Sequence, residues 1–395
     1  MTATVYLQAM DVVCALGQGH DAVREGLFRR DEPGGVAETG HYTPGRSLHL
    51  GCVPGRLPDV SHLPLRLRSR NNALLLSSLA GLRPQVEAAI ARFGPARVAI
   101  VLGVSTAGVE EGERAAALQL AEGRWPEGFD YAQQEMGNAA ACLAAELGVH
   151  GPAHTISTAC SSGAKALASG ARLLRAGLVD AVVAGGVDAL CRFTIEGFSA
   201  LEAVSEARCN PMSAARAGIN IGEGAALFLM GRDPGPLRLS GWGESSDAHH
   251  MSAPEPSGSG AVDAMRQALQ RAGLAPSAID YLNLHGTATA QNDAMESRAV
   301  AEVLGLDVPA SSTKPLTGHA LAAAGAVEAA FAWLTLVENP RGRLPPHWWD
   351  GERDPALAPL RLVAPGESLG RAPAHVMSNS FAFGGSNATL LFSAA

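Results

Sequence analysis

The chain has 395 residues, more than one simple hydrophobic core usually supports, so two domains or two fused halves are expected. Hydrophobic residues make up 47% of the chain and charged residues 17%, which indicates a large, well-buried globular interior. A net charge of −8 argues against nucleic acid as the main partner, because binding a polyanion needs a basic surface.

The cysteines favour a cytoplasmic protein with reduced thiols. Six cysteines are spread along the chain without a Cys-x-x-Cys pair or a Cys/His cluster in sequence, so neither a disulfide framework nor a metal site is indicated. No basic residue precedes Arg24, which argues against a secretory signal. The most apolar long stretch, 320–337, is alanine-rich and contains Glu328, which predicts a buried helix and no membrane partner.

In chain order, the first half alternates strands with helices, the pattern of an α/β fold. Strands are expected at 5–7, 12–13, 97–102, up to 158, 180–185 and 225–230, and helices at 21–29, 72–93, 138–147 and 164–176. The stretches 31–65 and 196–218 are interpreted as loops, and the charged stretch 110–128 as peripheral. Breaker residues at 233–236 mark the boundary between the halves.

The second half repeats the same rhythm. Strands are expected at 237–242 and 279–284, helices at 260–272, 294–304 and 320–337, and a final strand pair at 375–378 and 388–392. One long small-residue helix in each half suggests a pseudo-duplicated architecture, although the sequence match between the two is weak.

Cys160 lies at the junction of a strand and a helix. An apolar run ends at Thr158, and the small-residue helix 164–176 begins just after the cysteine. A helix N-terminus favours a thiolate by about 0.3–2 kcal/mol, which lowers the pKa of a thiol from about 8.5 toward about 7. A buried, inert cysteine is the alternative, but Gly163 and the adjacent serines leave room for a substrate to approach. We therefore predict a nucleophile at Cys160.

Two histidines lie at turns where a site is expected. His285 follows an apolar strand in Leu-His-Gly-Thr-Ala-Thr, and His319 precedes the apolar helix in Thr-Lys-Pro-Leu-Thr-Gly-His. A single histidine at a strand end is more often a satisfied hydrogen-bonding residue than a catalyst. Two such histidines, each flanked by Gly and Thr, favour a catalytic interpretation when they occur together with Cys160.

Lys314 and Glu328 are charged residues in apolar surroundings. Because buried charges must be paired, an ion pair between them is expected, and its role is open between structural and catalytic. Near the C-terminus, the glycine-rich stretch 380–387 offers backbone N–H groups that suit an oxyanion, although a plain hairpin connection would explain its glycines as well.

In this order these stretches resemble the signature motifs of the β-ketoacyl-acyl-carrier-protein synthases, the condensing enzymes of fatty-acid and polyketide synthesis within the thiolase superfamily. The matching stretches are Thr-Ala-Cys-Ser-Ser-Gly at 158–163, His-Gly-Thr-Ala-Thr at 285–289, Thr-Lys-Pro-Leu-Thr-Gly-His at 313–319 and Asn-Ser-Phe-Ala-Phe-Gly-Gly-Ser-Asn at 379–387. Segment 245–251 also resembles a family segment, so the similarity covers almost the whole chain. The resemblance implies an α/β, thiolase-like fold with five layers in the order αβαβα, built from two pseudo-duplicated halves. The first half, 1–235, would carry the nucleophilic cysteine, and the second half, 236–395, would carry the other motifs.

The resemblance also implies a reaction: decarboxylative Claisen condensation of an acyl-enzyme thioester with malonyl-acyl-carrier protein, which extends a fatty-acid, polyketide or polyene chain by two carbons. Cys160 would carry the acyl chain, and His285 and His319 would assist decarboxylation. Lys314 with Glu328 would hold the site.

Further roles follow from the same resemblance. Thr287 and Thr289 would bind the pantetheine arm, Phe383 resembles a gate, and Phe381 and Gly384 complete the substrate-binding set. The N–H groups of Cys160 and Phe383 would form the oxyanion hole. Neither a cofactor nor a metal is expected, because the substrates arrive on the phosphopantetheine of the carrier protein.

One loop departs from the family pattern. Where many members have Pro-Phe-Asp…Arg-Asp-Gly-Phe, this chain has Pro-Met-Ser…Arg-Ala-Gly-Ile at 211–219, which loses two acids and two aromatic residues. The usual internal contacts of this loop are therefore not expected.

The implied partners are an acyl-carrier protein and a second subunit, either a copy of the chain in a homodimer or a related ketosynthase subunit in a heterodimer. A non-catalytic chain-length partner would lack the nucleophile, so Cys160 argues against that alternative. A coenzyme A-dependent thiolase would pair the nucleophile with a second cysteine near the C-terminus, but none follows Cys209. A Cys-His hydrolase is a further alternative.

Docking of an acidic carrier protein to a chain of net negative charge requires a local basic patch. The candidates are Arg66, Arg68 and Arg70, which alternate with other residues before the helix at 72, and Arg208. Ordinary solvated arginines are the alternative at these positions.

Overall fold

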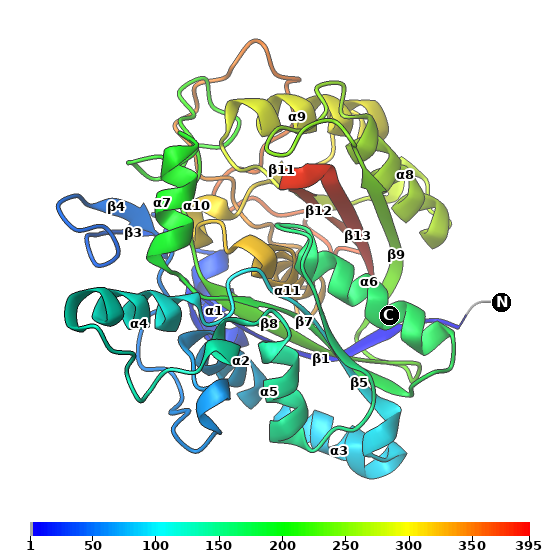
Figure 1. Ribbon diagram of the computed structural model, residues 1–395. Helices are drawn as coiled ribbons and strands as arrows, with labels where there is room; N and C mark the ends of the chain where they lie inside the picture. Colours follow the sequence, from blue (N-terminus) through cyan, green and yellow to red (C-terminus); the bar gives the residue numbers. More distant parts are fainter. Residues whose placement is uncertain (1–2) are drawn as a thin grey trace.

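The computed structural model describes residues 3–395 and is built around one large mixed sheet (Figure 1). The strands are β1 (Tyr6–Cys14), β2 (Gly17–Gln18), β3 (Ala37–Thr39), β4 (Leu48–Leu50), β5 (Val98–Gly103), β6 (Ala153–Ile156), β7 (Ala181–Asp188), β8 (Gly224–Gly231), β9 (Leu237–Ser246), β10 (Tyr281–Asn283), β11 (Ala310–Ser311), β12 (His375–Ala382) and β13 (Ser386–Ala394). Within residues 3–395 the large sheet has eleven strands, in the order β11-β10-β12-β13-β9-β1-β8-β7-β5-β6 with β2 beside β1, and β3 pairs with β4 separately.

The strand order is repeated in the two halves of the chain. The first strand of each half, β1 or β9, pairs antiparallel with the last, β8 or β13. That last strand pairs antiparallel with β7 or β12, which is followed by two parallel strands, β5 and β6 or β10 and β11. The halves are therefore structural duplicates, as the resemblance implied. They are joined where β1 pairs with β9.

Helices form three layers around the two half-sheets. The α-helices are α1 (His20–Leu27), α2 (Arg70–Ala80), α3 (Arg83–Phe93), α4 (Val109–Glu122), α5 (Asn138–Leu147), α6 (Ser162–Arg175), α7 (Arg192–Ala200), α8 (Ser259–Ala272), α9 (Ala290–Leu304), α10 (Lys314–Thr317) and α11 (Ala324–Leu336). Short 3₁₀ helices are η1 (Leu65–Leu67), η2 (Pro95–Arg97), η3 (Tyr131–Gln134), η4 (Pro276–Ala278), η5 (Leu321–Ala323) and η6 (Phe383–Gly385). Figure 1 shows α6 and α11 in the middle, α8 and α9 above them and α2, α3 and α5 below, which completes the αβαβα order.

The central helices meet at glycines. A Cβ at Gly163 would lie 2.7 Å from the backbone nitrogen of Ala326, and a Cβ at Gly325 would lie 2.9 Å from that of Ala164. Every residue of α11 is buried. The N-termini of α6 and α11 are therefore in backbone contact, which brings the turns that precede these helices to one place.

Several predicted boundaries differ from the structure. The single helix predicted at 72–93 is two helices, α2 and α3, with Gly81 between them. Gly81 is the C-cap of α2, and Pro84 lies in the first turn of α3, where a proline is tolerated because its missing N–H needs no intrahelical partner. A Cβ at Gly81 would lie 2.1 Å from a carboxylate oxygen of Asp11, which explains the glycine at this position. Part of the loop predicted at 196–218 is α7, and the two strands predicted at 5–7 and 12–13 are one bulged strand, β1. Across residues 3–395, no helix is both long enough and apolar enough to cross a membrane.

Candidate active site

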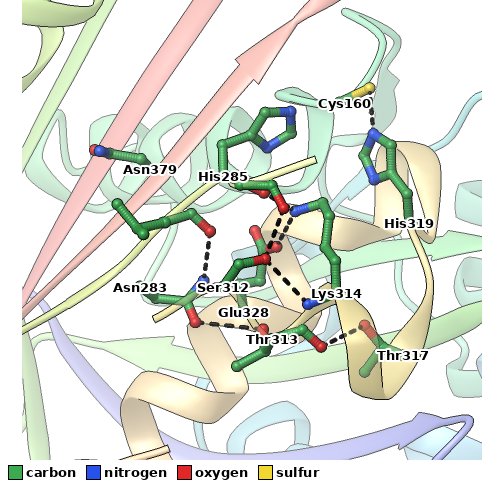
Figure 2. Close-up of polar contacts among 12 residues, drawn as sticks. Cys160, Asn283, His285, Ser312, Thr313, Lys314, Thr317, His319, Glu328 and Asn379 are labelled. Carbon is green, nitrogen blue, oxygen red and sulfur yellow. Dashed lines mark hydrogen bonds and ion pairs between the residues drawn. The ribbon is translucent and has the colours of Figure 1, made fainter. Parts of the chain in front are cut away.

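Cys160, His285 and His319 come together from three segments far apart in the sequence. Cys160 lies between β6 and α6, His285 follows β10, and His319 lies between α10 and η5. The Cys160 Sγ is 2.8 Å from His319 Nε2, and the two imidazole rings meet edge to face with centroids 5.3 Å apart (Figure 2). All three side chains are buried at the base of a pocket of about 500 Å³.

The turn that carries Cys160 is strained and is held by hydroxyl groups. Ala159 has φ 50°, a left-handed conformation that is unfavourable for a residue with a Cβ. The Ser162 hydroxyl accepts from the Thr158 N–H at 2.8 Å and donates to the Ala159 carbonyl at 2.5 Å. The Ser161 hydroxyl donates to the Thr158 carbonyl at 2.8 Å. These bonds present the Cys160 side chain at the start of α6.

Burial controls the protonation of Cys160, His285 and His319. It raises the pKa of the Cys160 thiol to about 12, against the opposing effects of the Lys314 charge and the Phe383 N–H. The prediction of a thiol pKa near 7 is therefore wrong, because desolvation of the thiolate outweighs the helix terminus. Burial, and secondarily the charge of Lys314, also lowers the pKa values of His285 and His319 well below the usual range. The resting site is a neutral thiol beside two neutral imidazoles.

Glu296 anchors the segment that carries His285. This buried α9 residue accepts from the His285 N–H at 2.8 Å and from the Gly286 N–H at 2.7 Å. Burial raises the pKa of Glu296 to about 7, against these two backbone hydrogen bonds. Glu296 is not among the residues predicted from the sequence, since a glutamate in a helix usually faces solvent. Its burial could have been inferred from the apolar residues Met295 and Ala299, which lie one and three positions away in the sequence and are also buried in α9.

The predicted ion pair between Lys314 and Glu328 is present. The Lys314 Nζ lies 2.6 Å from Glu328 Oε1 and donates to the His285 carbonyl at 2.5 Å (Figure 2). Both side chains are almost completely buried. The pair thus links the turn before His319, the loop of His285 and helix α11.

The other predicted substrate-binding residues lie around the pocket. Thr287, Thr289, Phe381 and Phe383 line it, and the two threonine hydroxyls are 3.0 Å apart. The Phe383 ring packs against Phe198 of α7 with centroids 5.6 Å apart, and the Phe383 N–H faces the Cys160 thiol. Gly384 has φ 77° and donates its N–H to the Met251 carbonyl at 2.8 Å, so it shapes the turn that positions Phe383.

The divergent loop at 211–219 has both internal and external contacts. Within the loop, Ser213 accepts from the Ala215 N–H at 2.9 Å and from Arg216 at 2.8 Å. Outside it, the Met212 N–H donates to Asp293 at 2.8 Å, the Ser213 hydroxyl donates to Asp350 at 3.0 Å, and Arg216 pairs with Asp354 at 2.6 Å. Since Arg216 and Ile219 line the pocket, these contacts also shape the cavity wall.

His347 connects this loop to the turn of Lys314. Its Nε2 lies 2.9 Å from the Pro211 carbonyl, and its Nδ1 accepts from the Ser312 N–H at 3.0 Å. Burial lowers the pKa of His347 to about 4, so the ring is neutral and donates through Nε2. His347 therefore ties the pocket wall to the ion-paired segment.

The four arginines predicted to dock a carrier protein fall into two groups. Arg66 and Arg68 are exposed on and beside η1. Arg70 donates to the buried carboxylate of Glu223 at 2.8 Å, and Arg208 donates to the carbonyls of Gly34, Val36 and Pro315. The guanidinium groups of Arg70 and Arg208 are therefore engaged inside the fold. Arg68 donates through Nε to the Leu63 carbonyl at 2.7 Å but its side chain stays exposed, so Arg66 and Arg68 remain as docking candidates.

Two family models match the chain. Residues 80–234 match the model described as "Beta-ketoacyl synthase, N-terminal domain", and residues 238–347 match "Beta-ketoacyl synthase, C-terminal domain". The two matches meet at the junction between β8 and β9.

Known proteins resemble the chain in sequence and structure. The 3-oxoacyl-acyl-carrier-protein synthase 2 of Rhizobium meliloti (strain 1021) is 37% identical over 262 residues, which are 62% of this chain and 61% of the relative. The ketosynthase ApeO, solved in complex with its chain length factor ApeC from Xenorhabdus doucetiae, is 42% identical with a TM-score of 0.94 and covers 100% of this chain and 98% of that chain. A β-ketoacyl synthase from Burkholderia phymatum STM815 is 28% identical with a TM-score of 0.86 and covers 100% of both chains.

Proposed function

Because the chain belongs to the β-ketoacyl synthase family, we propose that it catalyses the decarboxylative condensation of an acyl-Cys160 thioester with malonyl-acyl-carrier protein. The product is a β-ketoacyl chain two carbons longer, in fatty-acid, polyketide or polyene synthesis. The observation that carries the proposal is the 2.8 Å contact between Cys160 Sγ and His319 Nε2 at the base of a pocket that His285 and Phe383 also line.

The first half-reaction loads the acyl chain. As Cys160 Sγ attacks the thioester carbonyl, its proton passes to His319 Nε2, which is neutral and in contact. The Cys160 and Phe383 N–H groups are suited to the oxyanion of the tetrahedral intermediate. The carrier thiol leaves with a proton, and the acyl chain remains on sulfur.

The second half-reaction forms the carbon–carbon bond. Malonyl thioester loses CO₂, and negative charge develops on its thioester oxygen. Once Cys160 is acylated, His319 Nε2 no longer faces a thiol proton, so the His319 tautomer protonated at Nε2 and an N–H of His285 would stabilise the enolate. The enolate carbon attacks the acyl carbonyl, and Cys160 leaves as a thiolate that takes up a proton. Lys314 holds the His285 carbonyl and so positions the first imidazole. We propose that the reaction uses no metal or redox cofactor.

The decisive experiment is intact-protein mass spectrometry after incubation with acyl-carrier proteins of graded chain length. An acyl mass increase is expected on the wild type and on Cys191→Ala but not on Cys160→Ala, and the preferred chain length identifies the substrate. An acyl group mapped to Cys142 or Cys191 overturns the assignment of the nucleophile.

For the partners, we propose an acyl-carrier protein that docks near Arg66 and Arg68, and a second subunit that adds to strand β6. This strand is at the edge of the sheet, and its first two residues, Ala153 and His154, are exposed, which supports pairing with another strand. The second subunit is either a copy of this chain or a related ketosynthase subunit. ApeO, which is 42% identical to this chain, was solved in complex with its chain length factor, and this supports the second alternative.

Mass photometry of the chain alone, and after mixing with a candidate subunit, distinguishes the two assemblies. We also propose that the enzyme works in the cytoplasm. All six cysteines are free thiols among residues 3–395, which supports a reducing compartment.

A further inference from the structure

The three reactive side chains also form a set of metal donors. The Cys160 sulfur and one nitrogen each of His285 and His319 lie within 4.8 Å of one another, and all three residues are buried. One thiolate with two imidazoles is a donor set that Zn²⁺ accepts. The sequence did not indicate such a site, because the fold assembles the three residues from separate motifs.

Only small movements separate this arrangement from a coordination sphere. Bond lengths of about 2.3 Å to sulfur and about 2.0–2.1 Å to nitrogen place tetrahedral donors about 3.4–3.6 Å apart. The Cys160–His319 contact is now 2.8 Å, and the remaining separations do not exceed 4.8 Å. Within residues 3–395, Nδ1 of His285 and Nδ1 of His319 have no hydrogen-bond partner, so no bond at Nδ1 opposes a rotation of either ring.

The charges around the site permit a cation. The nearest positive charge is on Lys314, but Glu328 contacts its ammonium at 2.6 Å and offsets it. All three residues line the pocket, whose volume of about 500 Å³ has room for an ion and a water molecule.

We propose that Cys160, His285 and His319 bind a thiophilic divalent cation such as Zn²⁺, and that this binding reversibly inhibits the enzyme. The cation displaces the thiol proton into solvent and forms a sulfur–metal bond, so that Cys160 no longer attacks a thioester. Inhibition rests on the proposed nucleophilic role of Cys160, but binding does not. An enzyme acylated on Cys160 has no thiolate to offer and resists the cation.

The test uses Co²⁺ as a spectroscopic probe for the zinc position in the full-length protein. The wild type should bind one ion per chain with a thiolate-to-cobalt charge-transfer band, and Zn²⁺ should displace it. Cys160→Ser should lose the band, and His285→Ala and His319→Ala should weaken binding at least tenfold. Two controls should keep the band: Cys52→Ser, which alters a cysteine elsewhere, and the double variant His249→Ala/His250→Ala, which removes exposed surface imidazoles.

A second readout is alkylation of Cys160 by iodoacetamide, followed by mass spectrometry. Zn²⁺ should slow it at least tenfold, and EDTA should restore it. Absence of the cobalt band in the wild type, or a full band in Cys160→Ser, overturns the proposal. Circular dichroism checks the fold of each variant, and His285→Asn or His319→Asn replaces the alanine variant at the same position if that variant fails to fold. Acyl loading of the metal-free enzyme is measured separately, so a failure of the proposed reaction is distinct from a failure of metal binding.

Discussion

The two halves of the molecule repeat one strand order but hold their parts of the site by different chemistry. In the N-terminal half, hydroxyls of Ser161 and Ser162 hold the turn between β6 and α6 that carries Cys160. In the C-terminal half, the equivalent connection between β11 and α11 carries Lys314, which is paired with Glu328. The shared topology thus places both connections at the centre of the molecule. One of them carries the nucleophile, Cys160, and the other carries its charged support, the Lys314–Glu328 ion pair.

A second pair of equivalent positions shows the same divergence. After β5, the N–H groups of Ser105 and Thr106 donate to the buried carboxylate of Asp188. After β10, those of His285 and Gly286 donate to Glu296. Both halves therefore fix this loop with an acid, but only the second half places a reactive side chain on it.

The largest expected effect tests the charged support against the hydroxyl support. Lys314→Met leaves Glu328 buried and unpaired, so the free energy of unfolding should fall by about 3–5 kcal/mol. Ser162→Ala should cost only about 0.5–1.5 kcal/mol, the range for a neutral hydrogen bond. Urea denaturation measures both, and the double variant Lys314→Met/Glu328→Leu should recover most of the loss. Equal losses in the two single variants would remove the contrast between the halves.

The next effect separates the two histidines. His285→Ala should still become acylated at Cys160, but its decarboxylation of malonyl-carrier protein should fall about 10²–10³-fold, as for loss of an oxyanion donor. His319→Ala should slow both half-reactions, because the Cys160 thiol loses its proton acceptor. Mass spectrometry follows acylation and CO₂ release follows decarboxylation. Identical profiles for the two variants would contradict the division of roles.

A smaller effect concerns pH. The pKa of Glu296 is about 7 in the folded protein against about 4.5 in an unfolded chain, so the folded state binds this proton more tightly. The resulting stabilisation is complete below pH 4.5 and is lost as the pH rises through 7, an amount of about 3 kcal/mol. The stability difference between wild type and Glu296→Ala should therefore shrink from pH 5 to pH 8. Comparing the two profiles cancels the opposite contributions of the buried histidines, and a constant difference would refute the assignment.

The smallest effect lies on the surface. Arg68→Glu should raise the KM for carrier-bound substrate a few-fold, because an exposed charge pair is worth about 0.2–1 kcal/mol. The effect should shrink with added salt, and turnover of a small pantetheine thioester should not change. Arg208→Glu is the matched contrast, because the loss of its three carbonyl contacts should lower stability instead. Salt-independent kinetics of Arg68→Glu would exclude a docking role.

The sequence predicted the α/β alternation from its strand ends and glycine turns. The resemblance of four motifs to the family implied the duplicated halves and singled out the segments that the fold brings together around the pocket. It did not predict the anchor Glu296, which depends on a contact between distant segments, and the single helix expected at 72–93 overlooked the local break signal of Gly81 and Pro84. The pKa of Cys160 was predicted in the wrong direction because the helix terminus is visible in the sequence and burial is not. Arg70 and Arg208 were likewise predicted to be surface charges, because their partners, Glu223 and the Val36 carbonyl, come from distant parts of the sequence.

The central pairing of α6 with α11 has a consequence for the newly made chain. Helix α6 ends at Arg175, but the helix that covers it is complete only at Leu336. At about 5–20 residues per second, a ribosome needs roughly 8–30 s to add the intervening residues. During that interval the apolar face of α6 has no permanent cover. The first half should therefore be a client of chaperones that hold nascent chains, and truncation before α11 should give aggregates and not a folded half.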